Sequence, residues 1–250
     1  MNPWKDGECG PSDPGRRSAL FKLLSLGFRY PESELGQALL DGSFGEALQE
    51  ILAALPHLCE LTEGIEERLA RIGEEIRERG LSELEVDYVR TFDVGAPRPP
   101  CPPYEGLNRE GERTRIMLEV SEFYRHFGLQ MSAAEGARDL PDGLAAELEF
   151  LHFLAFKEEQ ARTAGAPDLL AGYVLAEKDF LERHLNQWVP RFAARLQEGA
   201  ANTFYSYLGH ILGEVIRLET ETLRVCCGRF PISEGPAAAA QTALSSGGPR

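Results

Sequence analysis

Apolar residues recur at intervals of three and four along most of this 250-residue chain, and this spacing limits the possible folds more than any other feature. Leu20, Leu23, Leu24 and Phe28 follow it near the start of the sequence. Such spacing places side chains on one face of an α-helix, whereas a half-buried strand alternates at every second residue. The sequence contains no convincing alternating run and no hairpin turn between two such runs. It therefore predicts an all-α protein.

The expected helices are numerous enough to form a single-domain helical bundle of about nine or more helices, interrupted by a proline-rich mid-chain loop. We expect them near 17–29, 33–54, 62–79, 81–92, 110–128, 142–162, 168–187, 190–198 and 202–226. The clearest apolar stripe consists of Ile116, Val120, Phe123, Tyr124 and Phe127. Gly128 is expected to end that helix. Pro190 is expected to separate two helices, because proline inside a helix costs about 3 kcal/mol.

The two ends of the chain lack helical spacing. Residues 1–15 contain three prolines and three glycines, and residues 229–250 are rich in small residues. Such segments bury too little apolar surface to order themselves. We expect a flexible lead at 1–15, one helical domain at 16–228 that includes a proline-rich loop at 94–106, and a flexible tail at 229–250.

Charge and cysteine content narrow the class of protein. The formal net charge is −14, which argues against nucleic-acid binding because phosphate recognition needs a basic surface. The five cysteines are odd in number and show no CxxC spacing, which is typical of free thiols in a reducing compartment. No apolar run reaches the roughly 18 residues that would cross a bilayer, so we expect no stable membrane insertion.

Arg16 and Arg17 precede an apolar stretch, as the paired arginines of a twin-arginine export signal do. However, Lys22 interrupts this stretch, Arg29 closes it, and no A-x-A-like cleavage site follows. The apolar spacing fits an amphipathic helix better. We therefore expect the protein to stay in the cytoplasm.

Candidate catalytic groups are few. Glu149 and His152 have the spacing that places a carboxylate and an imidazole one helical turn apart, but a di-iron bundle needs a second such pair, which the sequence lacks. The adjacent Cys226 and Cys227 would close a strained ring as a disulfide. No glycine-rich phosphate loop, G-x-S-x-G or H-E-x-x-H occurs. We expect no catalytic residues, no metal and no cofactor.

The stretch "FDVGAPRPPCPPYEG" at 92–106 carries five prolines between Pro97 and Pro103. It could be a domain linker, a displayed PxxP ligand or one wall of a binding site. Helical sequence flanks it on both sides, which favours a stiff loop between two helices of one bundle. Such a loop would hold Tyr104 and Glu105 in a fixed place, where the glutamate could meet an arginine of a partner.

Two ordered motifs resemble a known family. "ELEVDYVRTFDVGAPRPPCPPYEG" and the later "LPDGLAAELEFLHFL" are similar to the TorD/DmsD/NarJ family of cytoplasmic chaperones for molybdenum enzymes. "LLSLGFRYPESE" and "FLERHLNQWVPRF" also resemble family features, so the resemblance covers roughly residues 17–226. The family's Pro-Asp-His is Pro141-Asp142-Gly143 here, so a role that depends on that imidazole does not transfer.

The resemblance implies a chaperone that binds the immature catalytic subunit of a molybdopterin oxidoreductase of the dimethyl sulfoxide reductase type. It would hold the subunit's twin-arginine signal segment or its apo form, aid cofactor insertion and prevent premature export. Motif matches give these candidate binding residues: Asp87, Tyr88, Phe92, Tyr104, Glu105, Pro141, Asp142, Glu147, His184 and Trp188. For Phe92 and Trp188, plain core packing is an equally good interpretation.

Two other function classes stay open at this point. A small metal-dependent helical enzyme would bind metal when pure, and a permanent structural subunit of an oxidoreductase complex would co-purify with the mature enzyme. The sequence leaves open the client, the direct binding of nucleotide or molybdopterin, and the choice between a monomer and a dimer.

Overall fold

The computed structural model describes residues 13–131, 140–199 and 203–228. Over these ranges it contains helices and no strand, which confirms the all-α prediction. The α-helices are α1 (Pro14–Phe28), α2 (Ser33–Asp41), α3 (Ser43–Ala53), α4 (Ile65–Arg79), α5 (Leu81–Tyr88), α6 (Glu105–Asn108), α7 (Arg113–His126), α8 (Leu144–Thr163), α9 (Pro167–Arg183), α10 (Leu185–Gly199) and α11 (Phe204–Gly228). A 3-10 turn, η1 (Cys59–Thr62), and a π-helical turn, η2 (Val89–Asp93), complete the described elements. The expected flexible tail at 229–250, and most of the expected lead, lie outside the described residues.

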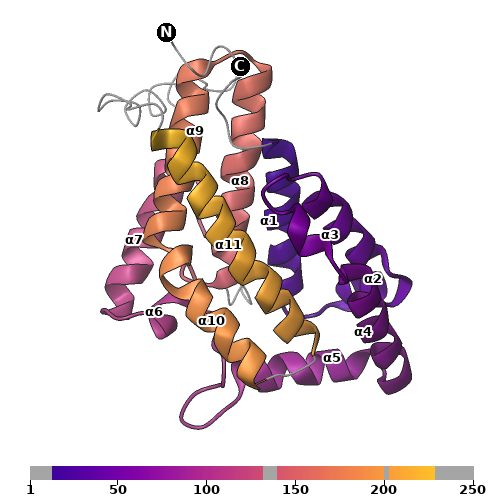
Figure 1. Ribbon diagram of the computed structural model, residues 1–250. Helices are drawn as coiled ribbons and strands as arrows, with labels where there is room; N and C mark the ends of the chain where they lie inside the picture. The colour runs from indigo at the N-terminus through magenta and orange to yellow at the C-terminus, as the bar shows by residue number, and fades with distance from the viewer. Residues whose placement is uncertain (1–12, 132–139, 200–202, 229–250) are drawn as a thin grey trace, which may run out of the picture.

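The long helices form an upright bundle with a smaller helical layer beside it (Figure 1). Within the bundle α1 packs along α8, α8 packs against α9, and α10 packs against α11. Helices α2 to α5 make up the side layer, and α2 packs against α4. No helix in the described ranges is long and apolar enough to cross a membrane.

The apolar stripes identified from the sequence face the core. Ile116, Val120, Tyr124 and Phe127 of the α7 region are buried, and Gly128 follows with a φ of 75°, a left-handed conformation that glycine adopts without steric cost. In α11 the apolar residues Phe204, Leu208, Ile211 and Val215, which are also spaced by three and four, are buried as well.

The prediction of a single helix at 33–54 is wrong, because the chain forms two helices there. Gly42 separates α2 from α3 with a φ of 86°, and the backbone N–H of Ser43 donates to the Asp41 side chain. Apolar spacing continues through this glycine, so periodicity alone could not show the break. The left-handed glycine turns the chain so that both helices keep an apolar face toward the core.

The prediction that a helix ends at Pro190 is also wrong. His184 makes the break, with φ −119° and ψ −94°, and α10 runs through Pro190. Proline at this position removes the N–H that would donate to the carbonyl of Asn186. Because Pro190 is exposed, that carbonyl lies on the solvent side of the helix, where water can replace the lost donor.

Arg17 anchors α1 in the bundle. Its guanidinium is fully buried and contacts Glu158 of α8 at 3.0 Å, Glu219 of α11 at 3.5 Å, and Glu177 of α9. We call these four residues the Arg17 cluster. Asp13 caps the helix, since its side chain accepts a hydrogen bond from the backbone N–H of Arg16 at 3.1 Å. The segment that carries the paired arginines is thus an integral helix of the folded protein.

Candidate functional site

The end of the proline-rich loop and the start of α8 lie against each other. The backbone N–H of Leu144 donates to the carbonyl of Pro103 at 2.9 Å, and that of Glu105 donates to the carbonyl of Asp142 at 2.8 Å. Tyr104 and Gly143 form an isolated antiparallel bridge between these bonds. The two sequence motifs that carry the family resemblance therefore meet in space.

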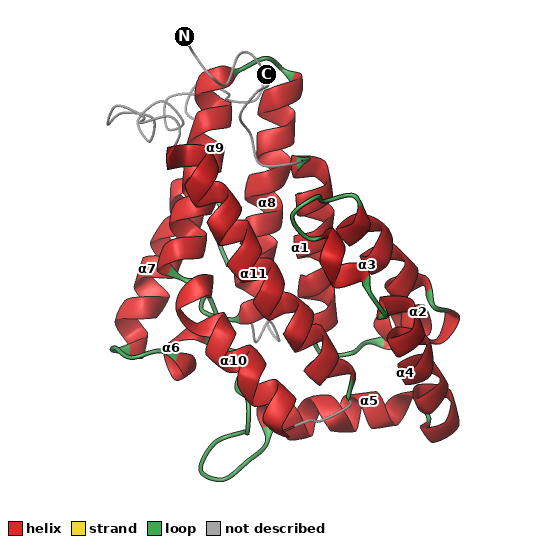
Figure 2. Ribbon diagram, viewed as in Figure 1, coloured by secondary structure: helices red, strands yellow, loops and turns green. Residues whose placement is uncertain are grey.

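The proline-rich loop has an exposed half and a buried half. Residues 93–98 are exposed, whereas Cys101, Pro102 and Pro103 are buried. Figure 2 shows the loop projecting from the bundle beside α10. Asn108 holds the buried half, because its side-chain amide donates to the carbonyl of Pro102 at 2.7 Å and to that of Tyr104 at 2.8 Å. Prolines lack an N–H, so their carbonyls are the groups that such a donor can fix.

A buried polar group, which we call the Glu105 cluster, lies under the loop and consists of Glu105, Glu147, His184 and Trp188. His184 Nδ1 donates to Glu105 Oε2 at 2.9 Å, and Trp188 Nε1 donates to Glu147 Oε2 at 3.2 Å. Arg109 also donates to the carboxylate of Glu105. All four side chains of the cluster are fully buried.

The surroundings of Glu147 favour its protonated form. Burial and the nearby carboxylate of Glu105 raise the pKa of Glu147 well above its ordinary value, and the hydrogen bond from Trp188 opposes this rise only in part. A protonated Glu147 can donate a hydrogen bond to the carboxylate of Glu105, which is paired with Arg109. The cluster is therefore a buried polar network that joins α6, α8 and α10, in which His184 Nε2 has no hydrogen-bond partner among the described residues.

Asp142 and Arg113 fix the position of the Tyr104 ring. The buried carboxylate of Asp142 accepts from the backbone N–H of Gly106 and from Arg113 Nε, both at 3.2 Å. The guanidinium of Arg113 lies 5.2 Å from the centre of the Tyr104 ring. Since Asp142 orients Arg113, and Arg113 covers one side of the ring, Tyr104 presents its remaining face outward.

A groove of about 810 Å³ opens beside Tyr104. Its walls come from the end of α1, from η2 and from the start of α8, and its lining residues include Phe28, Tyr30, Tyr88, Val94, Tyr104 and Gly143. Tyr30 and Val94 are unusually exposed for apolar side chains, at 47% and 62%. The exposed carboxylates of Glu32 and Asp93 also line the groove. It can thus accept an apolar segment with a basic group at its edge.

The structure separates the predicted binding residues into three sets. Tyr88 and Tyr104 line the groove, and the half-buried Pro141 lies beside it, between the lining residues Leu140 and Gly143. Asp87 faces another cavity, next to Phe204. The remaining six are buried: Phe92, Glu105, Asp142, Glu147, His184 and Trp188.

The buried residues support the groove from behind. Phe92 lies edge-on to Tyr88, with ring centres 4.9 Å apart, and stacks on Phe192 at 6.2 Å. The expectation that the Glu105 carboxylate is presented for a partner's arginine does not fit its complete burial against Arg109 and His184. The sequence motifs pointed to this region but did not single out Tyr30 or Val94 as binding residues. The only sequence feature that marks these two is their position directly before a proline or a glycine.

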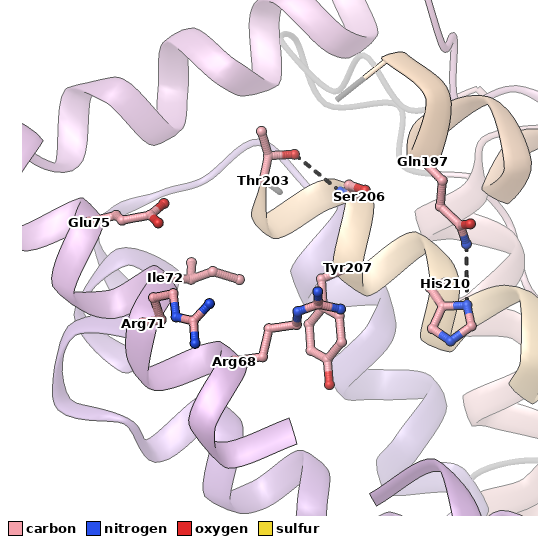
Figure 3. Close-up of a pocket in the computed structure, with 9 residues that line it drawn as sticks. All are labelled: Arg68, Arg71, Ile72, Glu75, Gln197, Thr203, Ser206, Tyr207 and His210. Atoms are coloured by element: carbon pink, nitrogen blue, oxygen red, sulfur yellow. Dashed lines mark hydrogen bonds between the residues drawn. The ribbon is translucent and has the colours of Figure 1, made fainter. Parts of the chain in front are cut away.

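A further cavity, of about 460 Å³, lies between α4 and the start of α11 (Figure 3). Its lining is polar: Arg68 lies 5.1 Å over the ring of Tyr207, and the side chains of Gln197 and His210 are 3.2 Å apart. None of the ten predicted residues lines it.

Glu149 and His152, the candidate metal pair, contact protein groups in the structure. Glu149 forms an ion pair with Arg29 at 2.5 Å and accepts a hydrogen bond from the ammonium of Lys22 at 3.3 Å. His152 Nδ1 lies 2.8 Å from the hydroxyl of Ser18. The described ranges contain no group of three or more histidine, cysteine, aspartate or glutamate residues suited to a metal ion.

Comparison with known proteins identifies the family. Residues 39–194 match the family described as nitrate reductase delta subunit. The chain belongs to this family. A member from Dechloromonas aromatica, the perchlorate reductase assembly chaperone protein, is 34% identical over 193 residues, which cover 76% of this chain and 81% of that one. The selenate reductase assembly chaperone protein of Thauera selenatis is 35% identical over 156 residues, which cover 59% and 78% of the two chains.

Two more distant comparisons cover most of the chain. The chaperone protein TorD of Shewanella loihica is 25% identical over 210 residues, which cover 83% of this chain and 92% of that one. The solved structure of a candidate redox enzyme maturation protein from Archaeoglobus fulgidus matches with a TM-score of 0.50 at 24% identity, covering 80% and 93% of the two chains. The resemblance to the TorD/DmsD/NarJ chaperones is confirmed. As a member of the nitrate reductase delta subunit family, the protein is an assembly chaperone and not an enzyme.

Proposed function

We propose that this chaperone serves the catalytic subunit of a molybdopterin oxidoreductase of the dimethyl sulfoxide reductase type. In the cytoplasm it holds the immature subunit by its twin-arginine signal segment or its apo form, aids cofactor insertion and prevents premature export. The assembly roles of the relatives named for perchlorate and selenate reductases support this proposal. The observation that carries it is the groove at the junction of the two family motifs, beside Tyr104 and Gly143.

The chemistry of the groove suits such a client. A twin-arginine signal has a basic region followed by an apolar helix. The faces of Tyr30, Tyr88 and Tyr104 offer apolar contact with a hydroxyl at each edge, while Glu32 and Asp93 offer negative charge. The groove also contains Arg29, which is paired with Glu149 and so adds little free positive charge. The net charge of −14 adds a long-range attraction for a basic segment.

The direct test combines identification of the client with one surface substitution. Affinity purification of the tagged chain from its native cells, followed by mass spectrometry, should recover a large molybdenum-enzyme subunit. Val94→Ser should then weaken binding of a peptide from that subunit's N-terminus about tenfold, because burying a valine contributes about 1.5 kcal/mol. Isothermal titration calorimetry measures this loss.

Leu118→Ser is the matched control. Leu118 is exposed to 60%, close to the 62% of Val94, but lies on α7 outside the groove lining. The control variant should bind the peptide like the parent, and both variants should keep the parent's thermal midpoint. If the Val94 and Leu118 variants bind the peptide with equal affinity, the client-binding surface lies outside this groove.

Salt dependence tests the electrostatic part of the proposal. Peptide affinity should fall as ionic strength rises, because the screening length shortens from about 10 Å at 0.1 M to about 3 Å at 1 M salt. Calorimetric titrations at low and high sodium chloride would show the change. Affinity that does not respond to salt would leave only apolar contact as the basis of recognition.

A further inference from the structure

The Arg17 cluster joins four helices through buried charges. Arg17 reaches from α1 to Glu158, Glu177 and Glu219, and each of these four side chains has a relative exposure of 0%. Two further groups touch the cluster from its edges. Arg162 of α8 donates to Glu158 at 3.2 Å, and His57, in the turn before η1, lies 2.8 Å from Glu219. The thiol of Cys227 on α11 is near Glu177 as well.

The charges of this cluster balance only if it holds one extra proton. Three ionised carboxylates face two guanidinium groups, those of Arg17 and Arg162, which leaves one negative charge uncompensated. An uncompensated charge in a protein interior is strongly unfavourable, so the group takes up a proton instead. The proton can reside on one of the carboxyls or on His57.

Geometry favours Glu177 as the proton carrier. Glu158 has Arg162 as a second cationic partner, and Glu219 has His57 as a second hydrogen-bonding partner. Among the described residues, the contacts of Glu177 include no cation other than the shared Arg17. Burial raises the pKa of Glu177 to about 8, and the carboxylates of Glu158 and Glu219 add to the rise that Arg17 opposes.

We propose that the Arg17 cluster is a one-proton latch, in which a proton held on Glu177 at neutral pH keeps α1 and the His57 turn fastened to α8, α9 and α11. When that proton leaves, the buried group carries excess negative charge and the hold on α1 weakens. The same helix carries Phe28 and Arg29 into the groove at its other end, so the latch sets how firmly one groove wall is held. This inference does not depend on the proposed client.

The direction of the pH effect follows from linkage. The pKa of Glu177 is about 8 in the folded chain, above its ordinary value of 4.5, so the folded state binds more protons between these values. The stability contributed by the proton is full below pH 4.5 and is lost as the pH rises through 8. One proton of difference raises the unfolding equilibrium constant about tenfold for each pH unit in this window.

Denaturant unfolding of the full chain from pH 5.5 to 9 tests the latch by comparing variants. The ratio of the unfolding constants of the parent and Glu177→Gln should change about tenfold per pH unit up to roughly pH 8 and then level off. The matched control, Glu221→Gln, alters a carboxylate on α11 that is 68% exposed, and its ratio to the parent should stay constant with pH. A constant ratio for Glu177→Gln would overturn the latch.

Two further measurements locate the proton. If His57→Gln abolishes the pH dependence and Glu177→Gln does not, the imidazole carries the proton and the assignment to Glu177 is overturned. Carbon-13 NMR of glutamate carboxyl groups in the parent protein covers the case in which Glu177→Gln fails to fold. If the carboxyl assigned to Glu177 titrates near pH 8, the latch is supported, whereas titration of that carboxyl below about pH 6 contradicts it, whatever the raised pKa of Glu147.

Discussion

Replacing Arg17 by alanine should lower the free energy of unfolding by about 3–5 kcal/mol, the usual cost of breaking a buried ion pair by removing one partner. The substitution leaves Glu158, Glu177 and Glu219 buried without their shared cation, although Arg162 and His57 remain at the edges. Total stabilities of ordinary domains are about 5–15 kcal/mol, so much of the protein's stability would be lost. Urea unfolding monitored by circular dichroism measures the change.

The neighbouring arginine provides a matched control for this prediction. Arg16 is 41% exposed and pairs only with Asp13 within the described contacts, so Arg16→Ala should change stability by less than about 1 kcal/mol. Adding Glu177→Gln to the Arg17→Ala variant should restore part of the loss, because one fewer carboxyl then remains buried without a partner. If the two arginine substitutions lower the free energy of unfolding equally, the Arg17 cluster stabilises the fold no more than an exposed ion pair does.

The contrast between Arg16 and Arg17 also shows what the sequence could predict. Apolar spacing predicted a helix at the start of the chain rather than an export signal, and α1 lies there. That spacing could not predict that one of two adjacent arginines would be fully buried. The burial of Arg17 depends on three glutamates from α8, α9 and α11, which are distant in the sequence and meet only in the packed bundle.

The sequence motifs predicted which segments supply the candidate site, but not which way each side chain faces. The Pro-Tyr-Glu segment and the Pro-Asp segment both supplied candidate binding residues, and the backbone hydrogen bonds from Glu105 and Leu144 place the two segments side by side. A polar residue in a motif can face a client or the core, and the sequence pattern does not distinguish these orientations. Buried networks such as the Glu105 cluster become visible only when the partners of each carboxyl are known.

Glu105→Ala should therefore destabilise the protein, by about 3 kcal/mol or more, instead of acting only on client binding. The carboxylate is fully buried, and its removal leaves His184, Arg109 and the protonated Glu147 without their shared acceptor. Glu105→Gln keeps the size and one acceptor oxygen, so its loss of stability should be smaller. Denaturant unfolding of both variants gives the comparison. A Glu105→Ala variant as stable as the parent would mean that this network is not needed for folding.

Tyr104→Ala should show the opposite pattern, with a small loss of stability and a loss of client affinity of more than tenfold. The ring is only half-buried and lines the groove, where one side rests on Arg113 and the other can contact a client. Tyrosine side chains at the centre of interfaces often contribute 2 kcal/mol or more, or roughly thirtyfold in affinity. Thermal unfolding and peptide titration, measured on the same sample, separate the two effects. If Tyr104→Ala unfolds as readily as Glu105→Ala, the ring belongs to the core. If it stays folded and binds the client like the parent, recognition depends on the Tyr30 and Val94 side of the groove.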